Sequence, residues 1–224
     1  MITKELKKRI LSSIILIPIT IFFIFQGTLF FGFFLSIILL VTSYEWIKMT
    51  KIYYLKIVGV CYLFFAFILA FFLREKFSLE LFLLILIISI FTDLGGYIFG
   101  KIFKGPKLIK ISPKKTYAGA LGGFILSLSA ALIYLKYIHT AADTHLNMSL
   151  LIRIAENKFY FLFVLFISFI SQVGDLMISY FKRLVNVKDT GNLLPGHGGL
   201  LDRLDGIIFA IPASYIILNY INIE

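Results

Sequence analysis

Seven long runs of apolar residues constrain this chain more than any other feature of its sequence. They cover roughly residues 10–26, 28–46, 57–73, 77–98, 117–138, 159–181 and 204–222. A transmembrane helix needs about 20 predominantly apolar residues. The chain is also 60% hydrophobic and contains 25 Phe, which is more apolar surface than a soluble fold of this size can bury. We therefore predict an all-α, polytopic integral membrane protein with about seven to nine transmembrane helices, the higher counts applying if 93–104 forms a separate short helix.

The basic residues lie mainly in alternate connecting segments. All Lys and Arg residues fall before the first run, after the second, after the fourth or after the sixth, except Arg74, Lys76, Lys136, Arg153 and Lys158. Cytoplasmic loops carry an excess of Lys and Arg, so this distribution predicts a cytoplasmic N-terminus. The net charge is +10. Because the bases are interleaved with apolar runs, we expect anionic lipid headgroups and phosphate ligands as partners, and no nucleic acid.

The segment 171–206 combines carboxylates with bases. Asp175 follows an unbroken apolar run, where an ionised group is costly unless it is partnered. Asp175, Ser179 and Lys182 share one helix face, and Asp202 and Asp205 share another. Mg²⁺ binds through one or two carboxylates and completes its shell with water and phosphate oxygens, and nearby bases can neutralise the remaining phosphate charge. These features predict a cation and phosphate site whose bases are Lys182, Arg183, Lys188 and Arg203.

A glycine-rich turn precedes the last apolar run. Gly196, Gly198 and Gly199 leave the backbone bare around His197, and such a loop before a helix can present amide groups to an anion. The alternative is that Asp202 and Asp205 simply stabilise the first turn of a helix. His197 can act as a base, as a ligand or as a hydrogen-bond donor to phosphate, or it can be a structural turn residue.

A second polar segment lies at 91–123. Asp93 and Tyr97 are one helical turn apart at the end of the fourth run, and two G-x-x-x-G patterns indicate close helix packing. The turn Ser112-Pro113 then leads into Lys114, Lys115 and Thr116, which are either part of a site or a positively charged membrane anchor. Glu45, beside Trp46 at the end of a run, is interpreted as an interfacial charge.

The residues from Ser179 to Asp205 resemble the signature of the phosphatidate cytidylyltransferase family. That signature reads S-x-φ-K-R-x4-K-D-x-G-x2-φ-P-x-H-G-G-φ-x-D-R-φ-D, with φ apolar, and every fixed position is met, including Asp189. Upstream, 111–119 is similar to a second family block, and Asp93, Gly95 and Tyr97 are similar to the D-x-G-x-Y before it. The chain departs from the family at Ala118, where a Glu is usual.

The resemblance implies a dimeric enzyme of the cell inner membrane that joins CTP and phosphatidate into CDP-diacylglycerol and pyrophosphate. It implies Mg²⁺ held by Asp175 and Asp202, with room for a monovalent cation such as K⁺. We accordingly divide the chain into N-terminal transmembrane helices, 1–90, and a catalytic transmembrane region with a cytoplasmic site, 91–224. The implied catalytic residues are Asp175, Lys182, Arg183, Lys188, Asp189, Asp202, Arg203 and Asp205. The implied substrate-binding residues are Asp93, Tyr97, Ser112, Lys114, Lys115, Thr116, Ser179, His197, Gly198 and Gly199.

The chemistry of this reaction does not call for a strong base. The attacking phosphate oxygen is already anionic near neutral pH, so catalysis should depend on positioning and on neutralising charge. We therefore expect His197 to matter less than Asp202. The alternatives are a CTP-using enzyme with another lipid acceptor, such as a polyprenol kinase or an archaeol-type cytidylyltransferase, and an ion-coupled transporter using Asp93 and Asp175.

Overall fold

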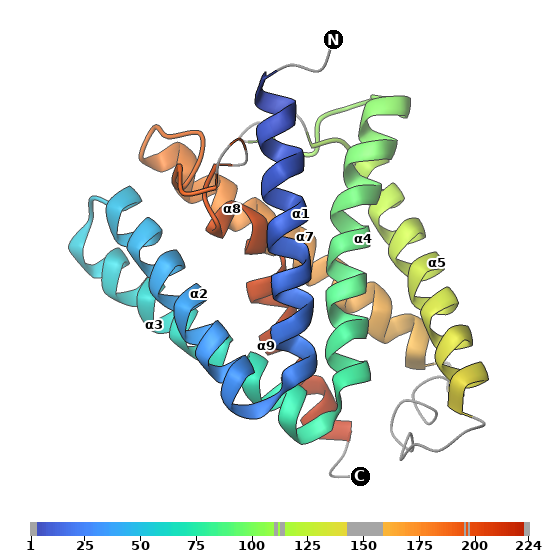
Figure 1. Ribbon diagram of the computed structural model, residues 1–224. Helices are drawn as coiled ribbons and strands as arrows, with labels where there is room; N and C mark the ends of the chain where they lie inside the picture. Colours follow the sequence, from blue (N-terminus) through green and yellow to red (C-terminus); the bar gives the residue numbers. More distant parts are fainter. Residues whose placement is uncertain are drawn as a thin grey trace.

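The computed structural model describes residues 4–109, 112, 115–142, 159–194, 196 and 198–221, and within these the regular elements are all helices (Figure 1). In chain order they are α1 (Lys4–Gln26), α2 (Thr28–Met49), α3 (Tyr53–Phe72), the π-helical turn η1 (Leu73–Phe77), α4 (Leu79–Phe103), α5 (Tyr117–Ala142), α7 (Phe159–Leu184), α8 (Leu201–Leu204) and α9 (Ile207–Ile221). The all-α prediction is confirmed.

Five segments are long and apolar enough to cross a membrane: Thr28–Met49, Tyr53–Phe77, Leu79–Phe103, Tyr117–Ile138 and Phe159–Leu184. The apolar stretches Leu11–Gln26 and Ile207–Tyr220 are shorter. Many large apolar side chains on these helices are exposed, Leu29 and Tyr53 among them, as expected for surfaces that face lipid. The chain is therefore a multi-pass membrane protein whose predicted count of seven to nine spans stays a prediction.

The prediction of a separate helix over 93–104 is wrong. Residues 93–103 continue α4 without a break, and the helix ends only where Lys104 and Gly105 adopt positive φ. The glycines in this stretch serve close packing of α4 on α5, as the G-x-x-x-G patterns predicted. A Cβ on Gly95 would lie 2.4 Å from the carbonyl oxygen of Gly122, and one on Gly119 would lie 2.7 Å from that of Gly96.

Local capping groups define the start of two helices. The Ser78 hydroxyl accepts a hydrogen bond from the Leu81 amide at 3.1 Å and begins α4. The Thr116 hydroxyl accepts one from the Gly119 amide, also at 3.1 Å, and begins α5. Side-chain oxygens at these positions satisfy amides that have no partner inside the helix. Thr116 is thereby fixed at the point where α5 approaches the other helices.

The ends of the helices fall into two groups (Figure 1). The start of α1, the end of α4, the start of α5 and the end of α7 lie at one end of the molecule. The α1–α2 turn, η1 and the end of α9 lie at the opposite end. The polar stretches 101–116 and 182–203 therefore connect helices at the same end. The arrangement brings the two predicted site segments together.

The α4–α5 contact gives a test of this packing. Gly95→Ala should destabilise the protein by about 1–3 kcal/mol, because the new methyl group overlaps backbone that has little room to move. Its neighbour provides a matched control, since a Cβ on Gly96 would meet nothing closer than 3.9 Å. Gly96→Ala should be neutral or slightly stabilising, because Ala favours the helix. Thermal unfolding in detergent measures both, and equal effects would contradict the proposed packing.

Candidate active site

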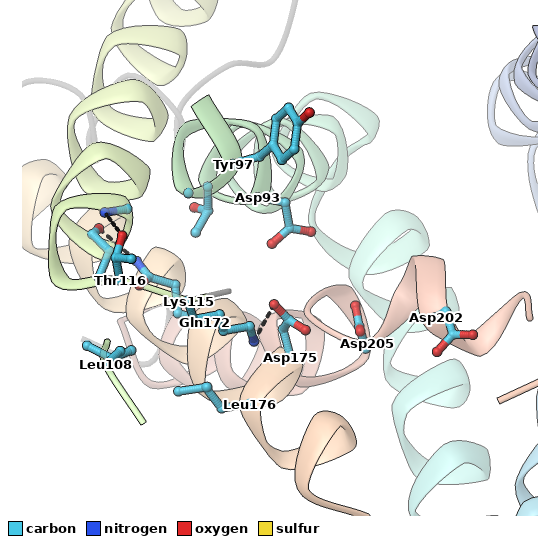
Figure 2. Close-up of a pocket in the computed structure, with 14 residues that line it drawn as sticks. Asp93, Tyr97, Leu108, Lys115, Thr116, Gln172, Asp175, Leu176, Asp202 and Asp205 are labelled. Carbon is cyan, nitrogen blue, oxygen red and sulfur yellow. Dashed lines mark hydrogen bonds and ion pairs between the residues drawn. The ribbon is translucent and has the colours of Figure 1, made fainter. Parts of the chain in front are cut away.

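A cavity of about 310 Å³ lies among α4, the start of α5, α7 and the α8–α9 segment. Its charged lining residues are Asp93, Lys115, Asp175, Asp202 and Asp205 (Figure 2). Neutral residues complete the wall: Thr92, Gly96, Tyr97, Leu108, Thr116, Gly119, Ala120, Gln172 and Leu176. Residues 93, 115, 175 and 202 are far apart in the sequence, so the cavity is formed by tertiary packing of helices and their connecting segments.

Three carboxylates meet from three elements. Asp93 comes from α4, Asp175 from α7 and Asp205 from the turn between α8 and α9, and Figure 2 shows them around one space. Asp205 is only 6% exposed, and its Oδ1 accepts a hydrogen bond from the Gly206 amide at 3.0 Å. Burial, followed by the charges of Asp175 and Asp93, raises the pKa of Asp205 well above its usual value. Such a group of like charges favours the approach of a cation.

Lys115 provides a positive charge to this group. Its ammonium lies 2.5 Å from Asp175 Oδ2, and both side chains are largely buried. Two backbone hydrogen bonds within the segment between α4 and α5 fix the position of Lys115. The Leu108 amide donates to the Lys115 carbonyl, and the Tyr117 amide donates to the Pro106 carbonyl. The lysine predicted as part of an anchor or a site therefore lies in the cavity.

Asp202 is held by three donors. Lys182 lies 2.7 Å from its Oδ1, and the amides of Thr190 and Gly199 donate to its Oδ2 at 2.8 and 3.1 Å. The carboxylate thus joins α7, the loop after α7 and the start of α8. Among the described residues, no three His, Cys, Asp or Glu side chains form a group suited to holding a metal ion. Convergence of Asp175 and Asp202 on one Mg²⁺ therefore stays a prediction, although both line the cavity.

The other predicted site residues divide into two groups. Tyr97 and Thr116 line the cavity, and Lys182 reaches it through Asp202. The described lining residues do not include the remaining ones: Ser112 and Ser179, which are half-buried, Arg183, Lys188, Asp189 and Arg203, which are exposed, and Gly198 and Gly199. Lys114 and His197 lie outside the described residues. The structure thus brings together the acids and two lysines, and leaves the other bases at the surface.

The glycine-rich turn is shaped by close contacts. Gly196 and Gly198 have φ of 81° and 90°, values that favour glycine. The Gly198 amide donates to the Leu194 carbonyl at 3.2 Å, and the Gly199 amide donates to Asp202. A Cβ on Gly199 would lie 2.1 Å from Thr190 Oγ1. These amides, predicted to bind an anion, have protein acceptors here, and the glycines allow the loop to pack tightly.

The interpretation of Glu45 as an interfacial charge is wrong. Its side chain is 1% exposed, at the end of α2, and binds the loop that carries Thr190 and Leu200. Helical periodicity relates residues within one helix and therefore contains no sign of a partner about 150 residues away. An acid beside a long apolar run was the available signal, since an ionised group there needs partners. Gln172 and Thr92 were also missed, because neutral polar residues are common in membrane helices.

The sequence of this chain matches a known protein family. Residues 52–221 match the cytidylyltransferase family. The chain belongs to this family. The match covers most of the chain, including α3 to α9, and so contains every residue that lines the cavity. It confirms the family resemblance drawn from the signature.

Three of the chain's relatives carry the same name. The chain is 41% identical over 128 residues to the phosphatidate cytidylyltransferase of Staphylococcus haemolyticus, covering 57% of this chain and 44% of that protein. It is 35% identical over 219 residues to the phosphatidate cytidylyltransferase of Rickettsia typhi, covering 95% of this chain and 92% of that protein. The Rickettsia felis protein of the same name is 35% identical over 213 residues. The chain therefore spans less than half of the staphylococcal relative and nearly all of the rickettsial ones.

The crowding of acids gives a pH-dependent prediction. Folding raises the pKa of Asp205. At pH values above the usual pKa of an Asp side chain, the folded protein therefore binds more protons than the unfolded protein, and the free energy of unfolding decreases as pH rises. Asp205→Asn should remove this loss and flatten the dependence of thermal stability on pH above about pH 4, the usual pKa of an Asp side chain. The exposed Asp189→Asn is the control and should leave the slope unchanged. An unchanged slope in Asp205→Asn would contradict the proposed repulsion.

Proposed function

We propose that this protein transfers the cytidylyl group of CTP to phosphatidate, giving CDP-diacylglycerol and pyrophosphate. The observation that carries this proposal is the cavity in which Asp93, Asp175 and Asp205 meet Lys115, with the Asp202–Lys182 pair at its edge. It lies at the end of apolar helices, where a lipid phosphate and a water-soluble nucleotide can both reach. Family membership and the names of the rickettsial and staphylococcal relatives support the same reaction.

The reaction joins two polyanions. A phosphatidate oxygen forms a bond to the α-phosphorus of CTP as the bond to the β-phosphate bridging oxygen breaks, and pyrophosphate leaves with that electron pair. The attacking oxygen is already anionic, so the main tasks are alignment and neutralisation of charge. Lys115 lines the cavity and Lys182 binds the lining residue Asp202, so each lysine is paired with an aspartate of the site. In the reaction these lysines balance phosphate charge, and the aspartates keep them in place between turnovers.

Mg²⁺ is the cofactor proposed for this site. Carboxylate oxygens are the protein ligands that suit it, and one or two carboxylates are enough when phosphates complete the shell. Asp175 and Asp202 would hold it, and Asp205 is the next candidate because it contacts Asp175. At Asp202 the ion would compete with Lys182 for Oδ1. When bound, the metal would supply positive charge to the phosphates, and a monovalent cation such as K⁺ could occupy the remaining acidic space.

The cellular setting is proposed on the same basis. We place the protein in the cell inner membrane as a homodimer, with the N-terminus and the cavity facing the cytoplasm. The grouping of the base-containing segments 101–116 and 182–203 at one end of the molecule supports this orientation, since cytoplasmic segments are rich in Lys and Arg (Figure 1). CTP is made in the cytoplasm, so the orientation also suits the substrate.

The direct test is transfer of radiolabelled CTP by the purified full chain with Mg²⁺ and phosphatidate. We expect a lipid-soluble cytidine product that depends on both lipid and metal. Asp175→Asn should lower the rate by about 10²- to 10³-fold, the usual cost of losing a charge that organises phosphate. Glu80→Gln, half-buried at the start of α4, is the matched control and should retain activity. Incorporation of label only with a polyprenol acceptor would favour a different lipid enzyme, and no lipid product at all would overturn the proposal.

The orientation has its own test. Cys61 is replaced by Ala, and single cysteines are introduced at Lys188 and Lys76, which lie at opposite ends of the molecule. A membrane-impermeant thiol reagent applied to intact cells should label Lys76→Cys and should leave Lys188→Cys unlabelled until the membrane is opened. Both positions are solvent-exposed, so accessibility depends on the side of the membrane. External labelling of Lys188→Cys alone would reverse the proposed orientation.

A further inference from the structure

Glu45 is a buried acid whose partners all belong to the predicted site loop. It lies in the last turns of α2 and is 1% exposed. Its Oε1 accepts the Leu200 amide at 2.9 Å, and its Oε2 accepts the Leu201 amide at 2.8 Å and the Thr190 hydroxyl at 3.3 Å. These bonds reach across 145 to 156 residues of sequence. The carboxylate therefore joins the N-terminal helices to the segment that carries Asp202.

The loop is built closely around this carboxylate. A Cβ on Gly191 would lie 2.7 Å from Glu45 Oε1, and one on Gly199 would lie 2.8 Å from Oε2. Two of the fixed glycines of the signature are thus small because the Glu45 side chain occupies the space beside them. Trp46 secures the end of α2, since its indole donates to the Leu55 carbonyl at 2.9 Å and its ring packs edge-on against Phe181.

Thr190 connects Glu45 with Asp202. Its hydroxyl donates to Glu45, and its amide donates to Asp202 Oδ2 at 2.8 Å. The Leu200 and Leu201 amides, bound by Glu45, begin the short helix α8 on which Asp202 lies. Leu200 itself provides no capping side chain. Glu45 thus takes the place of a local cap and fixes both the loop and the helix start that orient Asp202.

We propose that Glu45 is a positioning residue for the site, holding the loop after α7 and the start of α8 so that Asp202 faces the cavity and keeps its pairing with Lys182. It lies outside residues 52–221, the part of the chain that matches the family, and it does not line the cavity. It acts through Thr190 and the start of α8. The loop-ordering role stands on geometry alone, and its effect on turnover rests on the proposed function.

Glu45→Gln is the test variant, because it keeps the shape of the side chain but replaces one acceptor oxygen with the donor NH2 group of an amide. That group faces a backbone amide which also donates, so at least one hydrogen bond is lost. Hydrogen exchange on the full chain should show faster exchange, by at least about tenfold, in peptides covering 190–201. Peptides from the α4–α5 interface should be unchanged. Glu80→Gln is the matched control and should alter neither region.

Turnover gives the second measurement. Loss of an outer group that orients a site residue costs about 10- to 100-fold in activity, and we expect this loss in kcat with KM for phosphatidate nearly unchanged. Thr190→Val keeps the hydrogen bond from the backbone amide to Asp202 but removes the hydrogen bond from the hydroxyl to Glu45. Thr190→Ser keeps both hydrogen bonds. Thr190→Val should therefore show part of the loss of activity seen in Glu45→Gln, and Thr190→Ser should retain wild-type activity. The double variant Glu45→Gln/Thr190→Val should lose less activity than the two single losses combined would predict.

The outcomes separate the two proposals. Faster exchange confined to 190–201 without any cytidylyl transfer by the wild-type chain would support the positioning role and reject the proposed function. Unchanged exchange in 190–201 would overturn the positioning role, even if transfer is found. Faster exchange throughout the protein, in Glu45→Gln and in Thr190→Val alike, would also overturn it, because Glu45 would then stabilise the whole fold and not the loop.

Discussion

An ionised carboxylate at the end of an apolar helix is costly unless donors or cations surround it, and this constraint organises the cavity. Asp202 is met by Lys182 and two amides, and Asp175 by Lys115. Glu45 is met by two amides and a hydroxyl. Asp205 accepts a hydrogen bond from the Gly206 amide and lies near Asp175 and Asp93. The local excess of negative charge is therefore concentrated in one place, where a bound cation would relieve it.

The pairing of Lys115 with Asp175 and of Lys182 with Asp202 has a consequence for substrate binding. Breaking a buried ion pair without replacing the lost charge is strongly unfavourable. A phosphate that takes Lys115 or Lys182 leaves Asp175 or Asp202 in need of a new positive partner. A metal ion arriving with the nucleotide would satisfy that need at the same moment. If the proposed cation binds here, joint binding of nucleotide and cation would therefore be favoured over binding of either alone.

The helices could be predicted from the sequence because each depends on its own apolar run, and the acids Asp93, Asp175, Asp202 and Asp205 because charge is unusual beside such runs. The contacts between helices could not be predicted in the same way. The continuity of α4 past Asp93 depends on glycine contacts with α5, and the burial of Glu45 depends on a loop about 150 residues later. The pairing of Lys115 with Asp175 and of Lys182 with Asp202 likewise arises from packing between segments.

The long sequence separation between Glu45 and its partners also bears on how the protein is made. Leu201, which binds Glu45, follows it by 156 residues. At a synthesis rate of about 5–20 residues per second, α2 leaves the ribosome roughly 8 to 30 s before Leu201 does. During that interval the acid has none of its final partners, so the end of α2 must stay in contact with water or with the insertion machinery. The end of α2 can complete its contacts with the start of α8 only after that part of the chain has been translated.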